Sequence, residues 1–393
     1  MIDRIQKLLR EANLPAWLFY DFRGSDPIAY RVLGLDPKVH ATRRWFYLIP
    51  AKGTPRKIVH RIESGRLDAL PGERRIYLEW QSLDRILEEE LGSFSRLAMQ
   101  YSPDNSIPYL SKVDGGTLER IRRIGCEVVT SADLVQRFEA VLSPSQIAGH
   151  RRAASLLTRI VEEAFDHTAR AVTDRGETTE YEIQRFILDR FEEEELETDA
   201  PPIVGVNANS GDPHYEPSAG RSSPIRQGDF LLIDLWARPK LPDGVFADIT
   251  WVGYLGGQVP DRILEVFDAV RRGRDAGFAL LGRRYESGEP TQGWEVDEVV
   301  RDVIKRAGFG EAFIHRTGHN LGTSTHGNGV NFDNLETHDT REFIPGLACT
   351  IEPGIYLPEF GVRSEIDVYW GDSGPEITTP PQDSVLTHAV GSK

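Results

Sequence analysis

Residues 233–251 read IDLWARPKLPDGVFADITW, and they place two aspartates, Asp234 and Asp248, inside two apolar runs that predict buried strands. The segment between the runs holds two prolines and an Asp-Gly step, which is turn chemistry, so we expect a β-hairpin. A carboxylate is costly to bury without a partner. The hairpin would bring both acids close enough to contact one ion; the alternatives are turn caps or ion pairs with arginines.

A cluster of histidines lies further along the chain. Of its ten histidines, His315, His319 and His326 fall within FIHRTGHNLGTSTHGNG, residues 313–329. The glycines around them let the backbone approach closely, so the imidazoles can converge. One such histidine alone would indicate a polar loop or a satisfied core residue, and the cluster by itself does not name a metal.

Two glutamates stand in similar surroundings near the end of the chain. Glu352 lies in CTIEPGIYL, residues 349–357, and Glu365 lies in GVRSEIDVYW, residues 361–370. Each alone reads as a surface glutamate or an ion pair with Arg363. Four carboxylates and one histidine in strand-like or glycine-rich segments favour two divalent ions bridged by carboxylates. They do not suit a tetrahedral structural zinc site.

These segments together resemble the pita-bread metallopeptidases, the family that includes prolidase, aminopeptidase P and methionine aminopeptidase. The phrases TGHNLG, TIEPGIY and GVRSE are close to the family's patterns, and the resemblance covers about residues 140–375. It implies a metal-binding set, in chain order Asp234, Asp248, His319, Glu352 and Glu365. Asp234 would chelate one ion, and His319 with Glu352 would hold the other. Asp248 and Glu365 would bridge both ions.

The resemblance also implies the catalytic residues. His214, in DPHYEP at residues 212–217, and His326 match the family's active-site histidines. A hydroxide that bridges the two ions would attack the scissile carbonyl, and Glu352 would take and pass its proton. His326 would stabilise the oxyanion, and His214 would position the amide nitrogen side of the substrate.

Three further residues are candidates for substrate binding. His315 matches a position that lines the family's pocket, and Arg363 matches an arginine that steadies the bridging carboxylates. Arg341 stands in HDTREFIPG, residues 338–346, at the end of a long segment that could close over the site. A dipeptide carries a free carboxylate on its proline, which an arginine can grip with two hydrogen bonds. The alternative for Arg341 is a surface arginine paired with Asp339 or Glu342.

The sequence departs from the family's pattern at several positions. The two aspartates are 14 residues apart, further than is common in the family. Gly327 replaces a frequent acid after His326, and Trp251 replaces a frequent arginine. We expect these departures to affect the choice of substrate more than metal binding.

The periodicity of apolar residues predicts two domains, residues 1–140 and 141–393. The first resembles the smaller N-terminal domain of the prolidase, aminopeptidase P and creatinase branch, and alternation of strand and helix patterns predicts an α/β layer. Its strands are expected at 16–20, 44–50, 56–60, 96–101 and 126–131, with helices at the start and at 83–92. The second carries helix patterns at 143–172, 178–196, 261–281 and 296–308. The expected fold class is α+β, with a C-terminal pita-bread domain.

Composition limits the class of partner. The 393-residue chain has a net charge of −15, which argues against a nucleic-acid or anionic-membrane partner. Its two cysteines, Cys126 and Cys349, are too few for a disulfide framework and indicate a reduced, cytoplasmic setting. The first residues, MIDRIQKLLREANL, lack the apolar core of a secretory signal, and no apolar run approaches the ~18 residues of a membrane span.

The function implied by the resemblance is cleavage of the Xaa-Pro bond of dipeptides by a metallopeptidase with two divalent ions. Mn²⁺ is the expected metal, with Co²⁺, Zn²⁺ or Fe as alternatives. One rival is an aminopeptidase P that acts on longer Xaa-Pro peptides. Others are a binding protein that has lost its metal and a non-peptidase member of the fold, such as a creatinase-like enzyme or a lyase. A homodimer is also implied.

Overall fold

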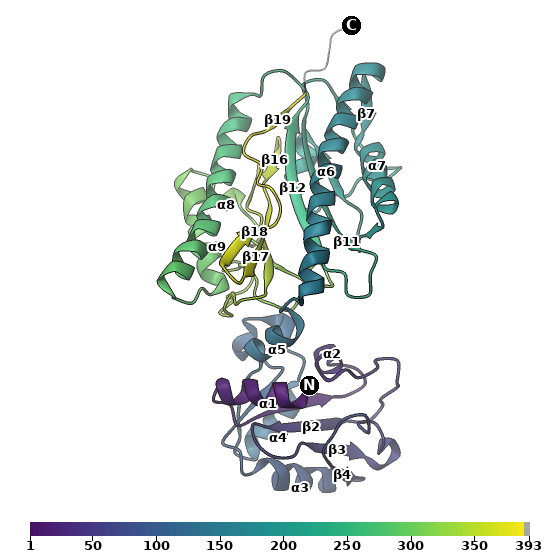
Figure 1. Ribbon diagram of the computed structural model, residues 1–393, viewed down its shortest axis with the longest axis vertical. Coiled ribbons are helices and arrows are strands. Elements are labelled where there is room, and N and C mark those ends of the chain that lie inside the picture. Colours follow the sequence, from purple (N-terminus) through teal and green to yellow (C-terminus); the bar gives the residue numbers. More distant parts are fainter. Residues whose placement is uncertain (389–393) are drawn as a thin grey trace. The chain divides into compact units, whose positions relative to one another are not determined.

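The computed structural model describes residues 1–388. The chain divides into two compact units, one of residues 1–139 and one that begins at residue 140 (Figure 1). None of the helices within the described residues combines the length and the apolar composition needed to cross a membrane.

The first unit is an α/β layer built on one six-stranded sheet in the order β4-β3-β2-β1-β5-β6. Its strands are β1 Ala16–Asp21, β2 Trp45–Pro50, β3 Arg56–His60, β4 Glu73–Tyr77, β5 Arg96–Met99 and β6 Glu127–Thr130. Its helices are α1 Ile2–Glu11, α2 Pro27–Leu33, α3 Trp80–Leu91, α4 Gly115–Arg123 and α5 Ala132–Glu139. The five strands and two helices expected from the sequence are confirmed, each within a few residues.

Strand β1 shows why this sheet has helices on both faces. Side chains alternate along a strand, so Trp17 and Phe19 enter one hydrophobic core while Leu18 and Tyr20 enter the other. All six residues of β1 are buried. A strand that is apolar on both faces is typical of a sheet covered on both sides.

The second unit holds two main sheets. One has the order β19-β12-β11-β8, with β9 also paired to β11, and the other has the order β13-β14-β17-β18. The strands of the first are β8 Leu196–Glu197, β9 Ile203–Val206, β11 Phe230–Pro239, β12 Ala247–Tyr254 and β19 Leu386–Thr387. Those of the second are β13 Asn320–Leu321, β14 Ala348–Ile351, β17 Ile366–Gly371 and β18 Gly374–Ile377. Two short pairs complete the unit: β7 Glu177–Thr179 with β10 Pro224–Arg226, and β15 Gly354–Tyr356 with β16 Gly361–Arg363.

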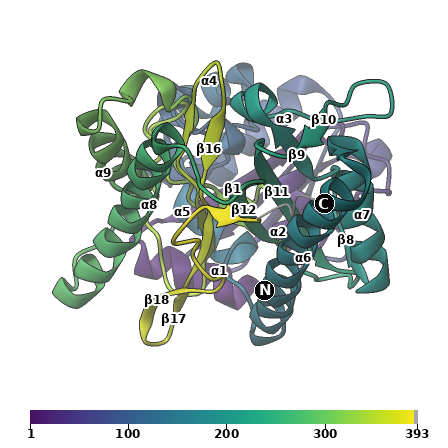
Figure 2. The same cartoon turned by 90° about the horizontal axis from the view of Figure 1, so that it is seen from above.

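Four helices enclose these sheets, and all four were expected from the sequence. They are α6 Pro144–Arg175, α7 Glu180–Glu193, α8 Asp261–Ser287 and α9 Gly293–Arg306. Figures 1 and 2 show α6 and α7 on one side of the strands and α8 and α9 on the other. The long helix α6 begins with a capping box between Ser143 and Gln146 and ends at Gly176 in the left-handed conformation.

The hairpin predicted from residues 233–251 is present as the antiparallel pair β11–β12. Strand β11 runs on through Pro239, so the connection covers residues 240–246 and begins later than the turn chemistry suggested. Proline is tolerated there because it stands at the end of the strand, where no ladder hydrogen bond from its nitrogen is required. The register of this hairpin sets the geometry of the site.

Candidate metal centre

The β11–β12 hairpin turns its two aspartates to one face. Asp234 pairs with Thr250 and Trp236 pairs with Asp248 across the two strands. Because side chains alternate, these four residues point to the same side of the sheet. Both carboxylates are buried, at 8% and 5% exposure of the residue.

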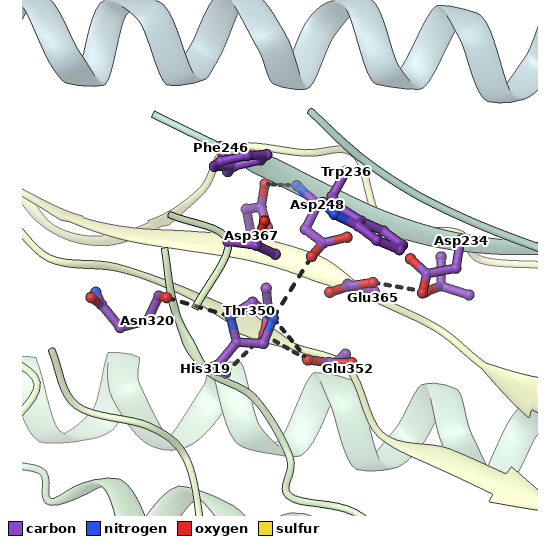
Figure 3. Close-up of polar contacts among 12 residues, drawn as sticks. Asp234, Trp236, Phe246, Asp248, His319, Asn320, Thr350, Glu352, Glu365 and Asp367 are labelled. Atoms are coloured by element: carbon purple, nitrogen blue, oxygen red, sulfur yellow. Dashed lines mark hydrogen bonds and ion pairs between the residues drawn. The ribbon is translucent and has the colours of Figure 1, made fainter. Parts of the chain in front are cut away.

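The second sheet supplies the facing wall. Glu352 follows β14, Glu365 precedes β17 and His319 precedes β13. His319 Nε2 lies 3.3 Å from Glu352 Oε1 and 3.7 Å from Asp248 Oδ2. One ligand atom each from Asp248, His319 and Glu365 lie within 4.8 Å of one another. Figure 3 shows the four carboxylates and the imidazole around one common space.

The ring of His319 is held with Nε2 toward the acids. Its Nδ1 lies 3.4 Å from the carbonyl oxygen of Asn320, and a carbonyl can only accept, so Nδ1 carries the hydrogen. The backbone N–H of His319 donates to Thr350 Oγ1 at 3.0 Å. Gly318 makes this packing possible, because a Cβ there would lie 2.0 Å from the carbonyl oxygen of Thr350. This explains one of the glycines that the sequence places around the histidines.

Arg363 supplies positive charge beside the acids. Its guanidinium donates to Asp234 Oδ2, to Thr250 Oγ1 at 3.0 Å and to the Tyr356 hydroxyl at 2.8 Å. Thr250 in turn donates to Glu365 Oε2 at 2.7 Å. Arg363 therefore contacts Asp234 directly and Glu365 through Thr250, and it also lines the cavity.

The acids outnumber the groups that could neutralise them. Asp234 Oδ1, Asp248 Oδ1 and Glu365 Oε1 are buried and have no hydrogen-bond partner among residues 1–388. Burial and the neighbouring carboxylates raise the pKa values of Asp248 and Glu365 well above their ordinary range. Burial likewise raises the pKa of Glu352 to about 7 and lowers the pKa of His319 well below its ordinary value.

These features fit divalent metal ions. Buried carboxylates that lack partners are stable when they coordinate a metal. An oxygen-rich donor set with one imidazole suits Mn²⁺ and similar ions and differs from a thiolate zinc site. The five residues that the sequence nominates are Asp234, Asp248, His319, Glu352 and Glu365, and the structure brings them to one place.

The cluster lies in a cavity of about 370 Å³. His214, His315 and His326 also line it, together with the apolar side chains of Pro201, Ile203, Pro213 and Trp236. The rings of His319 and His326 meet edge to face with centroids 4.4 Å apart. The cavity thus combines an acidic site, three further histidines and an apolar wall, which is typical of a binding site for a small molecule.

His315 has a more internal role than a substrate-binding histidine. Its Nδ1 lies 2.7 Å from the carbonyl oxygen of Arg316, and its Nε2 lies 2.7 Å from the Tyr356 hydroxyl. Tyr356 is the same residue that accepts from Arg363. Both ring nitrogens are therefore engaged within the protein, and His315 contributes to the cavity lining.

Arg341 is not in the cavity, so the expectation that it grips a substrate carboxylate is wrong. Its guanidinium is buried and pairs with Asp339 at 2.9 and 2.6 Å, and it donates to the carbonyl oxygen of Asn328 at 2.8 Å. Of the alternative considered from the sequence, a surface arginine paired with Asp339 or Glu342, the pairing with Asp339 is present, but Arg341 is buried. His338 is exposed and contacts Asn334 outside the cavity lining.

Several residues of the site were not anticipated. Thr250 joins Arg363 to Glu365, Tyr356 joins Arg363 to His315, and Trp236 forms part of the apolar wall. Asp199 fixes that wall by accepting from Trp236 Nε1 at 2.8 Å and from Thr325 Oγ1 at 2.9 Å. For Trp236 and Thr250 a signal was available, because each lies two residues from an aspartate and therefore shares its face of the strand.

Gly327 also has a structural reason. A Cβ at this position would lie 2.2 Å from Asn320 Oδ1, so the acid that is frequent after the second histidine could not be accommodated with Asn320 as it stands. The side chain of Asn320 is needed there, because its amide donates to Ala348 and its oxygen accepts from Gly329, each at 2.8 Å.

Comparison with known proteins identifies the family of the chain. The model of metallopeptidase family M24 matches residues 148–372. An uncharacterized peptidase of Staphylococcus saprophyticus is 28% identical over 249 residues, 62% of this chain and 64% of the relative. The Xaa-Pro dipeptidase of Lactobacillus helveticus is 28% identical over 237 residues, 60% of this chain and 58% of the relative. These matches thus span about three fifths of the curated relatives.

Solved structures match nearly the whole chain. The prolidase from Thermococcus sibiricus has a TM-score of 0.61 at 21% identity and covers 98% of both chains. The X-prolyl aminopeptidase from Caenorhabditis elegans, described as a cytosolic enzyme with a di-nuclear active site, has a TM-score of 0.62 at 16% identity. That match covers 98% of this chain and 62% of the other. At such identities the likeness concerns the fold, and the second unit has the pita-bread fold expected from the sequence.

Proposed function

The chain belongs to metallopeptidase family M24, and on that basis we propose that it is a two-metal peptidase that cleaves the Xaa-Pro bond of dipeptides. The observation that carries the proposal is the set of buried carboxylates with partnerless oxygens around His319, at one cavity of about 370 Å³. A cavity of this size suits a short peptide.

The four carboxylates and His319 would hold both ions. Asp234 would chelate one ion, and His319 with Glu352 the other. Asp248 and Glu365 would bridge them. The two ions would supply an activated water molecule and a Lewis acid for the scissile carbonyl.

The protein's own groups would do the remaining work. Glu352 lies in the cavity with Oε1 3.3 Å from His319 Nε2, where it would accept and return the proton of the attacking water. His326 stands beside His319 and would donate to the oxygen that develops negative charge. His214 lines the same cavity and would contact the leaving side of the peptide bond. Arg363 would hold Asp234 and, through Thr250, Glu365 in place.

The apolar wall supports proline as the residue after the cut. The bond before proline is a tertiary amide without an N–H, so a site that selects it needs an apolar slot in place of a hydrogen-bond acceptor. Trp236, Ile203, Pro201 and Pro213 offer such a surface beside the carboxylates. The similarity to the Xaa-Pro dipeptidase of Lactobacillus helveticus also supports proline as the residue after the cleaved bond.

An aminopeptidase P that acts on longer peptides is the second candidate. Prolidases and an X-prolyl aminopeptidase share the fold, so the fold does not separate these two candidates. Because Arg341 lies outside the cavity, the argument that it selects dipeptides no longer holds. A creatinase-like enzyme or a binding protein without metal is disfavoured by the complete carboxylate set. A lyase that uses the same ions is the remaining non-peptidase alternative.

The metal, the setting and the assembly are also part of the proposal. Mn²⁺ is the proposed metal, with Co²⁺ or Zn²⁺ as alternatives, because oxygen donors predominate. Two free, buried cysteines, Cys126 and Cys349, support a reducing, cytoplasmic setting.

A homodimer has two supporting observations. The first unit exposes large apolar side chains on its surface, among them Ile62 at 67% and Trp80 at 62%. Its charge is also opposite in sign to the rest. Residues 1–139 carry 22 basic and 19 acidic side chains, and residues 140–393 carry 24 and 42. Such complementarity would favour contact between the small unit of one copy and the acidic unit of another.

The test compares substrates of different length. The purified protein is assayed on Ala-Pro, Ala-Pro-Ala and Ala-Ala, each with Mn²⁺, Co²⁺, Zn²⁺ or chelator. We expect metal-dependent cleavage of Ala-Pro, slower cleavage of Ala-Pro-Ala and little cleavage of Ala-Ala. Faster cleavage of Ala-Pro-Ala would establish aminopeptidase P, and no cleavage of any peptide with any metal would overturn the proposal.

A further inference from the structure

Asp367 is a buried carboxylate that the proposed chemistry does not use. It lies on β17, two residues after Glu365, so the alternation of the strand turns both side chains to the same face. Its side chain is fully buried, and its Oδ1 has no hydrogen-bond partner within residues 1–388. Figure 3 shows it beside Asp248.

Asp367 connects the two sheets that form the site. Strand β12 pairs with β11 along one edge, and along its other edge the N–H of Asp248 donates to Asp367 Oδ2 at 3.0 Å. Two residues further on, the N–H of Glu365 donates to the carbonyl oxygen of Thr250 at 3.4 Å. The Asp367 carboxylate therefore occupies the place that a main-chain carbonyl would take if the two sheets were continuous.

The backbone of Asp367 is itself fixed on both sides. Its N–H donates to Thr379 Oγ1 at 2.7 Å, and its carbonyl oxygen accepts from the N–H of Thr378 at 2.9 Å. Both threonines follow β18, the strand that pairs with β17. The carboxylate thus projects toward Asp248 from a main chain that has little freedom to move.

His150, on α6, joins this arrangement to the start of β12. Its Nδ1 donates to the carbonyl oxygen of Phe246 at 2.7 Å, so its Nε2 is the acceptor for the Thr378 hydroxyl at 2.7 Å. Burial lowers the pKa of this imidazole to about 4, so the ring is neutral at pH 7. Its Nε2 lies 3.9 Å from Asp367 Oδ2, which is too long for a direct hydrogen bond.

We infer that Asp367 is a positioning residue, which holds the main chain of Asp248 so that the Asp248 carboxylate faces His319 and Glu365. The inference rests on the proposed metal centre, since Asp248 is one of its bridging ligands. Asp367 acts as a hydrogen-bond acceptor for an N–H, and its charge is secondary to this role. Partners of metal ligands of this kind contribute about 10- to 100-fold to metal affinity or activity.

Two substitutions separate the acceptor from the charge. Asp367→Asn keeps the size and retains a carbonyl oxygen for the Asp248 N–H, whereas Asp367→Leu removes the acceptor at similar volume. We expect the affinity for Mn²⁺, measured by calorimetric titration, to fall about 10- to 100-fold in Asp367→Leu. The Mn²⁺ affinity of Asp367→Asn should stay within about 3-fold of the wild type, because the amide oxygen of asparagine still accepts the hydrogen bond from the Asp248 N–H. Saturating Mn²⁺ should restore most of kcat in Asp367→Leu, because every catalytic group is still present.

Asp372→Leu is the matched control, because Asp372 is exposed in the turn of the same β17–β18 hairpin. Should Asp367→Leu fail to fold, Thr379→Val removes the hydroxyl that accepts from the Asp367 N–H, and we expect a several-fold loss of affinity. Wild-type affinity in folded Asp367→Leu, or an equal loss in Asp367→Asn, would overturn the inference. Absence of Mn²⁺ binding by the wild type would instead overturn the metal centre itself.

Discussion

Two sets of buried acids in the second unit differ in how their oxygens are satisfied. Four acids away from the cavity each accept four hydrogen bonds: Glu180, Asp297, Asp333 and Asp339. In the cavity, Asp234, Asp248 and Glu365 each keep one buried oxygen without a partner among the described residues. All seven are buried, so burial alone does not separate the two sets.

The difference teaches that a functional carboxylate combines a partnerless oxygen with a place in the cavity, since Asp367 Oδ1 is also partnerless among residues 1–388 but Asp367 does not line the cavity. Asp333 accepts from three successive backbone N–H groups and one hydroxyl, so it is complete within the fold and orders residues 333–337. Asp248 Oδ1 is buried without a hydrogen-bond partner among residues 1–388, and burial together with the neighbouring acids raises the pKa of Asp248. We call a buried acid incomplete when one of its oxygens lacks a hydrogen-bond partner, and burying such an acid without an ion destabilises the folded protein. Groups with pKa values perturbed in this way cluster at functional sites.

The largest effect should come from removing an incomplete acid. Asp248→Ala or Glu365→Ala should lose both ions and reduce kcat/KM by roughly 10³-fold or more, because several kcal/mol of charge stabilisation are lost. Metal content and hydrolysis of Ala-Pro would be measured on the same samples. Full metal content with full activity in Asp248→Ala would show that Asp248 is not a metal ligand.

Removing an acid whose oxygens all have hydrogen-bond partners should instead reduce the stability of the metal-free protein. Asp339→Ala leaves the buried guanidinium of Arg341 without its partner, which should lower the free energy of unfolding by about 3–5 kcal/mol. Asp248→Ala should not destabilise the metal-free protein, because it relieves repulsion between neighbouring acids. Urea denaturation of the metal-free variants checks both statements. Equal losses of stability in the two variants would remove the distinction between the sets.

A histidine of the cavity wall should affect rate without affecting the ions. His326→Ala should lower kcat by roughly 10²- to 10³-fold, as expected for one donor to a developing oxyanion. The metal content should remain that of the wild type, since His326 lies beside the proposed ligands and is not one of them. A wild-type kcat in this variant would leave His326 as a packing residue.

The acids that line the cavity should also make the metal-free protein sensitive to pH. Burial raises the pKa of Glu352 from its ordinary 4.5 to about 7, so the folded state retains a proton that the unfolded chain releases at lower pH. Stability is therefore lost as the pH rises from about 4.5 to about 7. Between these values wild type should lose roughly 3 kcal/mol relative to Glu352→Gln, which cannot titrate. Denaturation of both proteins at pH 5 and pH 8 measures the difference, and a constant difference would contradict the account.

The sequence predicted those parts of the site that depend on local pattern. Asp234 and Asp248 interrupt apolar strands, and a turn between them predicts the hairpin that aligns them. The helices α6 and α8 follow from long amphipathic repeats. Strand β4 was missed because its sequence, ERRIY, is charged and lies at the edge of the sheet, where arginines are tolerated.

The rest depended on contacts that the sequence does not display. The sequence around Arg341 does not indicate whether its side chain faces a substrate or a neighbouring acid. Only the folded structure shows that its guanidinium donates to Asp339. The link between Asp367 and Asp248 joins residues 119 positions apart in two different sheets. Such contacts follow from how the sheets pack, which apolar periodicity does not determine.

The central claim is that the incomplete acids hold two metal ions, and the most direct test is to count the ions. The metal-free protein would be titrated with Mn²⁺ by calorimetry, and the loaded protein would be analysed for metal after removal of free ions. We predict two ions per chain in the wild type and fewer than one in Asp248→Ala, with a higher Tm for the loaded wild type. Failure of the wild type to bind Mn²⁺, Co²⁺ or Zn²⁺, or binding that is unchanged in Asp248→Ala, would contradict the account.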